Sequence, residues 1–264
     1  MSEPTLYPES GFLRLRIDLA YDGTNYSGWA KQPDQRTIQE EIEKALSTIT
    51  QTPIETIVAG RTDAGVHASG QVIHLDVPEA CEFGDLEFKL NCMLEEDIRI
   101  LKVTAQSNAF HARFSATQRS YIYKILDANQ TVSPLQRLDV APWYRALDLN
   151  ILNLASALLL GTHDFAAFCK FREGATTVRN LMRFNWVRDA DGYLIADIAA
   201  DAFCYSMVRN LVGAVVCVAE GRNSLEWISA MLANKERVPD SLVFVARGLT
   251  LHHVDYPTNQ VRIN

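Results

Sequence analysis

Closely spaced cysteines are missing from this sequence of 264 residues. Zinc sites and disulfide frameworks need paired or clustered cysteines, and no Cys-x-x-Cys pair occurs, so the sequence predicts neither. The six histidines include no His-Glu-x-x-His spacing. We therefore expect free thiols and no metal. The five cysteines are Cys81, Cys92, Cys169, Cys204 and Cys217.

Long apolar runs are also missing. Leu211 to Ala219 is among the longest apolar stretches, and it is far shorter than the roughly 20 residues that a membrane span requires. Residues 1–10 are polar, contain Pro4 and Pro8, and lack the basic-then-apolar design of a signal peptide, which predicts a short flexible lead. The hydrophobic content of 48% and charged content of 22% are ordinary for a globular protein. We expect a cytoplasmic protein with no membrane partner.

An excess of positive charge is absent as well, because the net charge is −7. Since binding to phosphates depends on clustered Lys and Arg, this sum argues at first against nucleic acid. The charges are nevertheless segregated along the chain. Residues 81–97 carry six acidic residues and one lysine, whereas residues 110–125 carry three basic residues and no carboxylate, and residues 170–188 carry five basic residues and one glutamate.

Aromatic residues lie within and beside these two basic stretches. A run of charge usually means a solvated face, but Arg together with aromatic rings can hold a phosphate backbone and stack on an unpaired base. An RNA-binding surface is therefore a hypothesis to set beside the solvated face. The aromatic residues are Phe110, Phe114, Tyr121, Tyr123, Phe168 and Phe171.

The hydrophobic pattern of the first half predicts strands and helices in alternation. Apolar and polar residues alternate over residues 12–21, which predicts a half-buried strand that ends in a turn. Thr37 and Glu40 form a capping box at the start of a helix with apolar residues at helical spacing. Further strands are predicted at residues 71–77 and 98–103, with a helix at 85–94 between them.

The second half contains the same kinds of element. We predict a strand at 119–126, a helix at 148–160 that ends at Gly161, and a hairpin of strands 181–188 and 193–198. Helices at 202–219 and 224–232 and a strand at 249–254 follow. No Pro-rich or Ser-rich linker separates the halves. The sequence therefore predicts an α+β fold in which two halves, residues 11–115 and 116–264, share a continuous sheet, with a cleft between them.

The segment Gly60 to Ala68 is a candidate for chemistry. It follows the apolar run 54–59 and places Asp63 between Arg61 and His67, with glycines at positions 60 and 65. A strand that breaks into a glycine-containing turn would present the carboxylate at the end of a rigid element. The alternative is an ordinary turn in which Asp63 caps the backbone and Arg61 is a solvated neighbour.

Arg209 has an unusual setting. It lies in the apolar segment 203–216, where removing a guanidinium from water is costly unless a carboxylate pairs with it. The pattern does not name that carboxylate, and a structural ion pair that ties a helix to a sheet would satisfy it equally well.

The chain resembles the tRNA pseudouridine synthases of the TruA type from about residue 12 to about residue 256. A lone Arg-Thr-Asp would be weak support, but six blocks match in order and spacing. The blocks are Tyr21-Asp22-Gly23-Thr24 with Tyr26 and Gly28-Trp29, Thr37-Ile38-Gln39, Gly60-Arg61-Thr62-Asp63-Ala64-Gly65-Val66-His67, Phe110-His111-Ala112-Arg113-Phe114-Ser115-Ala116, Tyr121-Ile122-Tyr123, and Met207-Val208-Arg209-Asn210.

This resemblance implies an isomerase that converts uridine to pseudouridine at positions 38 to 40 of the tRNA anticodon stem-loop. It implies a mixed, mainly antiparallel sheet with helices on one face and a central cleft, a homodimer, and no metal or cofactor. By the family pattern Asp63 is the nucleophile, and it acts on a uridine whose base has been flipped out of its stack. Arg209 pairs with Asp63 in the same pattern.

The family pattern also assigns roles to other residues. Tyr121 stacks on the flipped uracil and assists proton transfer, and Arg61 occupies or supports the space that the base leaves. Further residues are candidates for substrate binding, chiefly through phosphates, which position RNA without reading its sequence. These residues are His67, Arg113, Lys170, Arg172 and Arg179.

Three departures from the family pattern affect loop shape and RNA contacts rather than the residues above. They are Ala30 after Gly28-Trp29, Leu94-Glu95-Glu96-Asp97-Ile98 in place of a Leu-Pro-Asp-Ile type of sequence, and Ser206 where the family often has His.

Two rival functions stay open. A glycosidase also cuts a bond at an anomeric carbon but needs a second, paired carboxylate, and a non-catalytic RNA-binding protein would leave Asp63 idle.

Overall fold

The computed structural model describes residues 8, 10–80, 83–170, 174, 176–235 and 242–257. These residues form two compact units, and each is described by itself. Unit 1 contains the described residues up to Thr117 and from Leu251 onward, and unit 2 contains Gln118–Thr250. The strand β10 (Leu249–Asp255) begins in unit 2, and its residues from Leu251 belong to unit 1.

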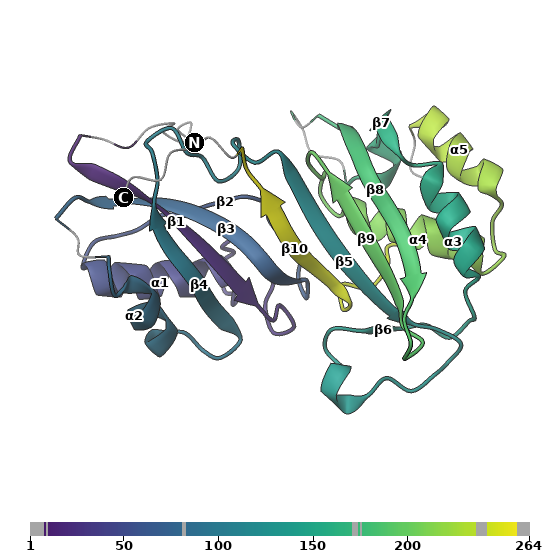
Figure 1. Cartoon of the computed structure of the whole chain (residues 1–264), viewed down its shortest axis with the longest axis horizontal. Helices are drawn as coiled ribbons and strands as arrows, with labels where there is room; N and C mark the ends of the chain where they lie inside the picture. The colour runs from purple at the N-terminus through teal and green to yellow at the C-terminus, as the bar shows by residue number, and fades with distance from the viewer. Residues whose placement is uncertain are drawn as a thin grey trace. The chain divides into compact units, whose positions relative to one another are not determined.

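Unit 1 is an antiparallel sheet packed with two helices (Figure 1). Its strands lie in the order β4-β1-β3-β10, with the short strand β2 beside β3. The predicted strands and helices of the first half are all present. Their bounds are β1 (Phe12–Tyr21), α1 (Ile38–Thr50), β2 (Ile57–Val58), β3 (His67–Pro78), α2 (Leu86–Met93) and β4 (Ile98–Ala105).

The alternation of β1 matches its burial from Leu15 onward, whereas Arg14, at a polar position, is also buried. Leu15, Ile17 and Leu19 are fully buried, and α1 buries Ile38 and Ile42 on the side facing the core. One local prediction is wrong: Thr37 is the N-cap residue of α1, but its side chain makes no capping hydrogen bond. Its hydroxyl oxygen is buried without a hydrogen-bond partner, so the expected capping box is not formed.

The strands of unit 2 lie in the order β5-β9-β8-β7, with β6 parallel to β5. The predicted hairpin is confirmed, because Arg188 of β8 pairs with Leu194 of β9 and the two strands run antiparallel. The strands are β5 (Gln118–Leu126), β6 (Ala141–Pro142), β7 (Gly161–Asp164), β8 (Val178–Arg188) and β9 (Leu194–Ala200).

Three helices pack together in unit 2 (Figure 1). They are α3 (Leu149–Ala157), α4 (Met207–Ala219) and α5 (Leu225–Asn234). Two short 3-10 turns also occur in unit 2, η1 (Pro134–Gln136) between β5 and β6 and η2 (Ala166–Phe168) between β7 and β8. Two predicted bounds are wrong. The helix predicted at 148–160 ends at Ala157, and Gly161 begins β7. The helix predicted at 202–219 begins at Met207, because Ser206 adopts the left-handed conformation with φ 58°.

The predicted α+β class with mixed, mainly antiparallel strand pairing is therefore confirmed. Within the described residues, no helix is both long and apolar enough to cross a membrane. Cys92, Cys169, Cys204 and Cys217 are free thiols, while Cys81 and residues 1–7 and 9 of the predicted lead at residues 1–10 lie outside the described residues.

Helix α4 forms the centre of unit 2, and Gly213 lies where it meets the chain at Leu242. A Cβ atom at position 213 would lie 1.8 Å from the carbonyl oxygen of Leu242. We expect Gly213→Ala to lower the free energy of unfolding by about 1–3 kcal/mol or more, because that backbone must move. Urea unfolding measures the effect. Gly84→Ala is the matched control, since no atom lies within 4 Å of its Cβ position; equal losses in both variants would contradict the close approach.

Candidate active site

Asp63 lies in the loop of residues 59–66 between β2 and β3. Its side chain is half-buried, and Arg61 is exposed. The expected turn after a strand is confirmed: Ala59 N donates to Val72 O over 2.8 Å, and Val66 N donates to Asp63 O over 3.1 Å. Gly65 has a φ of +76°, a conformation that side-chain-bearing residues rarely adopt. These hydrogen bonds and the conformation of Gly65 therefore fix the backbone of the loop.

The backbone of the segment after β1 forms hydrogen bonds with the backbone of this loop. Trp29 N donates to Thr62 O over 3.1 Å, and Gly65 N donates to Tyr26 O over 3.3 Å. Gly28 allows the contact, because a Cβ atom there would lie 2.9 Å from Thr62 O. The sequence block Tyr21 to Trp29 thus supports the backbone that carries Asp63.

A buried side-chain network ties the same loop to two strands. The hydroxyl of Tyr21 lies 2.8 Å from Thr62 Oγ1, and Gln71 Nε2 donates to Tyr21 over 3.2 Å and to Gly60 O over 2.8 Å. Burial raises the pKa of Tyr21 to about 12, although its bonds to Thr62 and Gln71 act in the opposite direction. The hydroxyl therefore stays neutral near pH 7 and keeps its proton for a hydrogen bond.

His67 begins β3 and contacts the segment after β1. Its Nδ1 accepts from Gly23 N over 3.2 Å and lies 3.0 Å from Asp22 Oδ1. Burial alone would raise the pKa of Asp22, but hydrogen bonds from Thr24 and the nearby His67 outweigh it, so the pKa is lowered. His67 thus lies close to an ionised carboxylate at one end of the Asp63 loop.

Arg113, the predicted phosphate contact in unit 1, is exposed in a turn that is fixed from below. His111 is buried, and its Nδ1 accepts from the backbone N–H groups of Arg113 and Phe114, each over 3.2 Å. His74 Nδ1 accepts from Ala112 N over 3.1 Å. Both rings therefore act as acceptors at Nδ1, which places the proton on Nε2.

A fully buried arginine lies under the same turn. Arg14 forms two 2.8 Å contacts with the carboxylate of Asp76 and donates to Phe110 O over 2.9 Å. Burial lowers the pKa of His74 to about 3, and the charges of Arg14 and His111 act in the same direction. Burial followed by the charge of Arg14 also lowers the pKa of His111.

Tyr121 and Arg209, two of the predicted catalytic residues, belong to unit 2. Tyr121 on β5 is 7% exposed and meets Phe203 edge to face, with ring centroids 5.2 Å apart. Arg209 lies in the first turn of α4, and its Nε donates to Phe244 O over 2.8 Å. Phe244 N donates back to Arg209 O over 3.1 Å, so this arginine is anchored on both its backbone and its side chain.

The basic stretch 170–188 divides into two kinds of residue. Arg183 and Arg188 are structural, because each pairs with a carboxylate, of Asp197 and Asp127 respectively, over 2.6 Å and 2.8 Å. Lys170 is exposed, with Nζ 5.3 Å from the centre of the Tyr205 ring. Arg179 bonds the hydroxyl and carbonyl of Thr176, and Arg172 lies outside the described residues.

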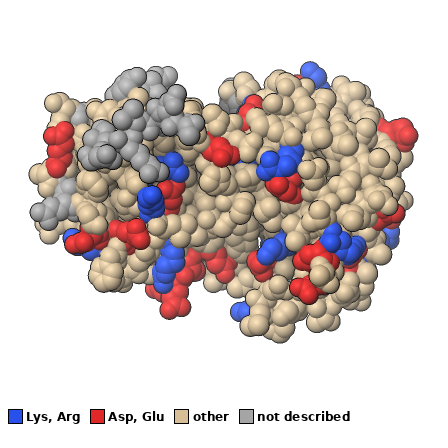
Figure 2. Space-filling view, in the orientation of Figure 1, with Lys and Arg blue, Asp and Glu red and all other residues tan. Residues whose placement is uncertain are grey.

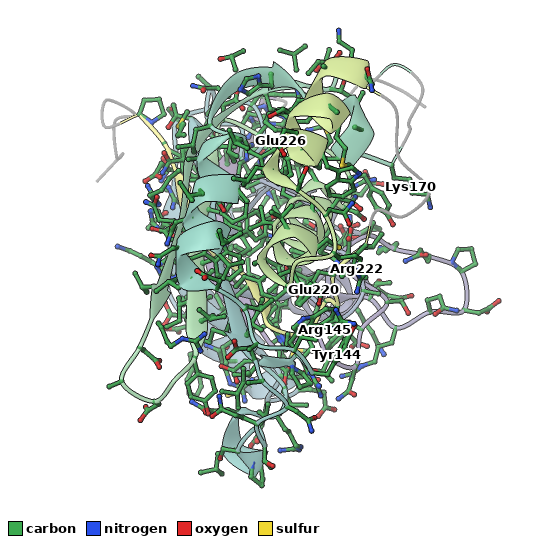
Figure 3. The ribbon with its side chains drawn as sticks, turned by 90° about the vertical axis from the view of Figure 1, so that its right-hand side faces the viewer. Tyr144, Arg145, Lys170, Glu220, Arg222 and Glu226 are labelled. Carbon is green, nitrogen blue, oxygen red and sulfur yellow. The ribbon has the colours of Figure 1, made fainter. Side chains whose placement is uncertain are left out.

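Charges of both signs lie near one another on the face shown in Figure 2, which has no uniformly basic area. Figure 3 shows a mixed group in unit 2 that the sequence did not indicate, with Lys170 lying away from it. The buried carboxylate of Glu220 contacts Arg222 over 2.5 Å and accepts from Trp143 Nε1 over 3.1 Å. Arg222 also donates to Tyr144, so these charges are used within the unit.

The structure places Arg61, Asp63 and His67 on one loop and strand of unit 1, and it places Tyr121 on β5 and Arg209 on α4 of unit 2. Tyr21 lies in one of the family blocks and Gln71 in a predicted strand, but the sequence pattern assigns neither residue a role at the site. Polar residues in otherwise apolar strands were the available signal. No group of three potential metal ligands occurs among the residues that the structure describes.

Comparison with known proteins identifies the class. A family model described as tRNA pseudouridine synthase matches residues 19–115 and 155–257. The chain is 49% identical to tRNA pseudouridine synthase A of Frankia casuarinae, over 94% of this chain and 90% of that protein. It is also 49% identical to the protein of the same name from Streptomyces griseus, over 95% of this chain and 90% of that protein.

The chain therefore belongs to the tRNA pseudouridine synthase family, and the predicted resemblance is confirmed. A chain in the structure titled "Crystal Structure of a Cbf5-Nop10-Gar1 Complex" aligns with 78% of this chain and 54% of its own length. Its identity is 10% and its TM-score 0.34, a similarity too weak to support an argument.

The network around Thr62 predicts a local effect of Tyr21→Phe. Loss of the hydroxyl removes the partner of the buried Thr62 hydroxyl and one of the two acceptors of Gln71 Nε2, which costs about 1–3 kcal/mol. We expect faster hydrogen exchange at the amides of Trp29 and Val66, which bond the loop. Tyr193→Phe is the control, because it removes a hydroxyl that bonds Gln136 in unit 2. Unchanged exchange at both amides would show that Tyr21 does not hold the loop.

The lowered pKa of His74 predicts a dependence of stability on pH. The unfolded chain takes up a proton near pH 6.5, whereas folded His74 does so near pH 3, so the unfolded state binds more protons between these values. Stability is therefore fullest above about pH 6.5 and declines as the pH falls toward 3. We expect His74→Asn, which cannot titrate, to show a shallower decline in urea midpoint between pH 7.5 and 4.5. An identical decline in both proteins would assign the effect to other groups.

Proposed function

We propose that this protein converts uridine to pseudouridine at positions 38 to 40 in the anticodon stem-loop of tRNA, with Asp63 as the nucleophile. Family membership over most of the chain supports the reaction. The observation that supports Asp63 is its half-exposed carboxylate on a loop whose backbone is fixed from both strands and from the segment after β1. A nucleophile needs a backbone that is held in one position, because a small displacement of the reacting group lowers the reaction rate strongly.

The reaction is an isomerisation with no net loss of atoms. The bond between uracil N1 and ribose C1′ breaks, the base turns, and a bond forms between uracil C5 and C1′. The proton on C5 leaves and N1 gains one. Asp63 attacks either the uracil ring or C1′, and both routes use a single carboxylate. The base must leave its stack to reach this carboxylate.

Other residues take supporting roles in this proposal. Arg209 pairs with Asp63 and orients its carboxylate, Tyr121 stacks on the uracil and assists transfer of the C5 proton, and Arg61 supports the space that the flipped base leaves. The edge contact of Phe203 holds the ring of Tyr121, and the bond to Phe244 holds Arg209. These two anchors restrict the side chains before substrate arrives.

The proposal includes a cleft between two halves that share one sheet, a homodimer, a cytoplasmic location and no metal or cofactor. His67, Arg113, Lys170, Arg172 and Arg179 are the proposed substrate contacts. Lys170 and Arg113 are exposed, which suits contacts with phosphates.

Asp63→Asn tests the nucleophile. An amide is a poor nucleophile of nearly the same size, so we expect pseudouridine formation to fall by at least about 1,000-fold while tRNA binding is largely retained. Pseudouridine is mapped in a tRNA transcript after incubation with each protein, and binding is measured separately.

Asp85→Asn is the matched control, because Asp85 is an exposed aspartate of unit 1 remote in sequence from the loop. Conversion by Asp63→Asn at the wild-type rate would remove the nucleophile assignment. Release of free uracil by the wild-type protein would instead indicate a glycosidase.

A further inference from the structure

The structure separates the aromatic residues of the basic stretches by their exposure. Phe110, Tyr123 and Phe168 are at most 1% exposed and belong to the core, and Tyr121 is 7% exposed. Phe114 differs from them, with 61% of its surface exposed. A phenylalanine side chain that is this exposed to water gains little of the favourable free energy of burying apolar surface. Exposed aromatic surface often marks a binding site.

The ring of Phe114 is supported on one side. The imidazole of His111 packs against it in a tilted arrangement, with ring centroids 4.4 Å apart and an interplanar angle of 30°. The guanidinium of Arg113 lies 5.4 Å from the centre of the Phe114 ring. Since His111 is 3% exposed, the pair consists of a buried ring beneath an exposed one.

The turn beneath Phe114 is fixed by four buried or partly buried polar contacts. His111 accepts from the backbone N–H of Phe114, and Ser115 N donates to His111 O over 2.9 Å. His74 accepts from Ala112 N, and Tyr256 donates its hydroxyl to Ala112 O over 2.7 Å. A platform fixed in advance loses little conformational entropy when a ligand stacks on it.

The basic residue beside Phe114 is Arg113, which is exposed. Arg119 and Lys124 of the same basic stretch belong to unit 2, where Arg119 is buried and donates to Asp201 O over 2.8 Å and Lys124 pairs with Asp139. Phe88 provides the contrast: it is 73% exposed on α2, but it follows Glu87 in the acidic stretch 81–97. Among the described residues, no aromatic ring or guanidinium contacts Phe88. Exposure alone therefore does not distinguish Phe114 from Phe88, whereas exposure with a supporting ring and an arginine does. Tyr144 of unit 2 has the same combination, but its hydroxyl accepts from Arg222 within that unit.

We propose that Phe114 is a stacking platform for an unpaired base of the RNA substrate, and that Arg113 binds a phosphate next to that base. A base stacks on an aromatic face whatever its identity, so the platform contributes affinity and position rather than sequence recognition. The proposal rests on the proposed function for the identity of the RNA as tRNA. It concerns binding and does not depend on which residue is the nucleophile.

The test is the dissociation constant for a tRNA transcript, measured by fluorescence anisotropy with full-length protein. Stacking is worth about 1–3 kcal/mol per base, so we expect Phe114→Ala to weaken binding roughly 5- to 150-fold. Phe114→Leu keeps apolar bulk without a ring and should be nearly as weak. Phe114→Trp should bind within about twofold of the wild type, because it keeps an aromatic face.

Phe88→Ala is the matched control, since it removes a more exposed phenylalanine from an acidic surface of the same unit, and its affinity should be unchanged. Thermal unfolding of each variant checks that the fold is intact. In addition, the fluorescence of Phe114→Trp should be quenched on RNA binding beyond any quenching seen in Phe88→Trp, because a stacked base quenches an indole directly.

Salt dependence separates the two contacts. Arg113→Gln should lower the slope of log affinity against log salt by about 1, whereas Phe114→Ala should leave the slope unchanged. Wild-type affinity in Phe114→Ala would overturn the platform while leaving the proposed function intact. If Phe114→Ala instead changed the oligomeric state and kept RNA affinity per protomer, the ring would be an interface with a second copy. Failure of the wild type to bind tRNA would overturn both proposals.

Discussion

The buried hydroxyl of Tyr21 connects three parts of unit 1 that are distant in sequence. It bonds Thr62 of the Asp63 loop and accepts from Gln71 of β3, which also holds Gly60. Loops between strands open more readily than the strands themselves when few contacts restrain them. These bonds, together with the backbone contacts of Trp29 and Gly65, fix the backbone that carries Asp63, while the side chain of Asp63 stays half-exposed.

The same principle recurs in the turn that carries Arg113 and Phe114. There too, exposed side chains stand on a backbone whose N–H groups are bonded to buried rings, and the buried Arg14 secures Phe110 and Asp76 beneath. Neutral histidines suit this place because each offers an acceptor at Nδ1 without adding charge beside Arg14. In both places polar groups that are hidden from water set the position of the groups that we propose to meet the substrate.

In unit 2, single contacts rather than a buried hydrogen-bond network hold the side chains of the proposed catalytic residues. Arg209 is tied through its Nε to Phe244, and Tyr121 is restrained by the edge of Phe203. The basic stretch 170–188 shows how composition can mislead, since Arg183 and Arg188 pair with Asp197 and Asp127 within the unit. A count of positive residues cannot tell such structural pairs from residues that remain available for phosphate. The list of candidate RNA contacts is therefore shorter than the list of arginines.

The sequence by itself determined the α+β class, nearly every strand and helix, and the family, because periodic burial and motif spacing are local properties of the chain. It failed where a bound depends on one backbone conformation: Ser206 adopts φ 58°, so α4 begins at Met207 rather than near residue 202. The division of the chain was also beyond local pattern, since residues from Leu251 onward belong with unit 1 although they come last. Tertiary structure alone decided that Tyr21 and Gln71 hold the Asp63 loop, and that Phe114 is exposed while Phe110 is not. Burial and hydrogen bonding between distant residues are fixed only when the strands that carry them pack together.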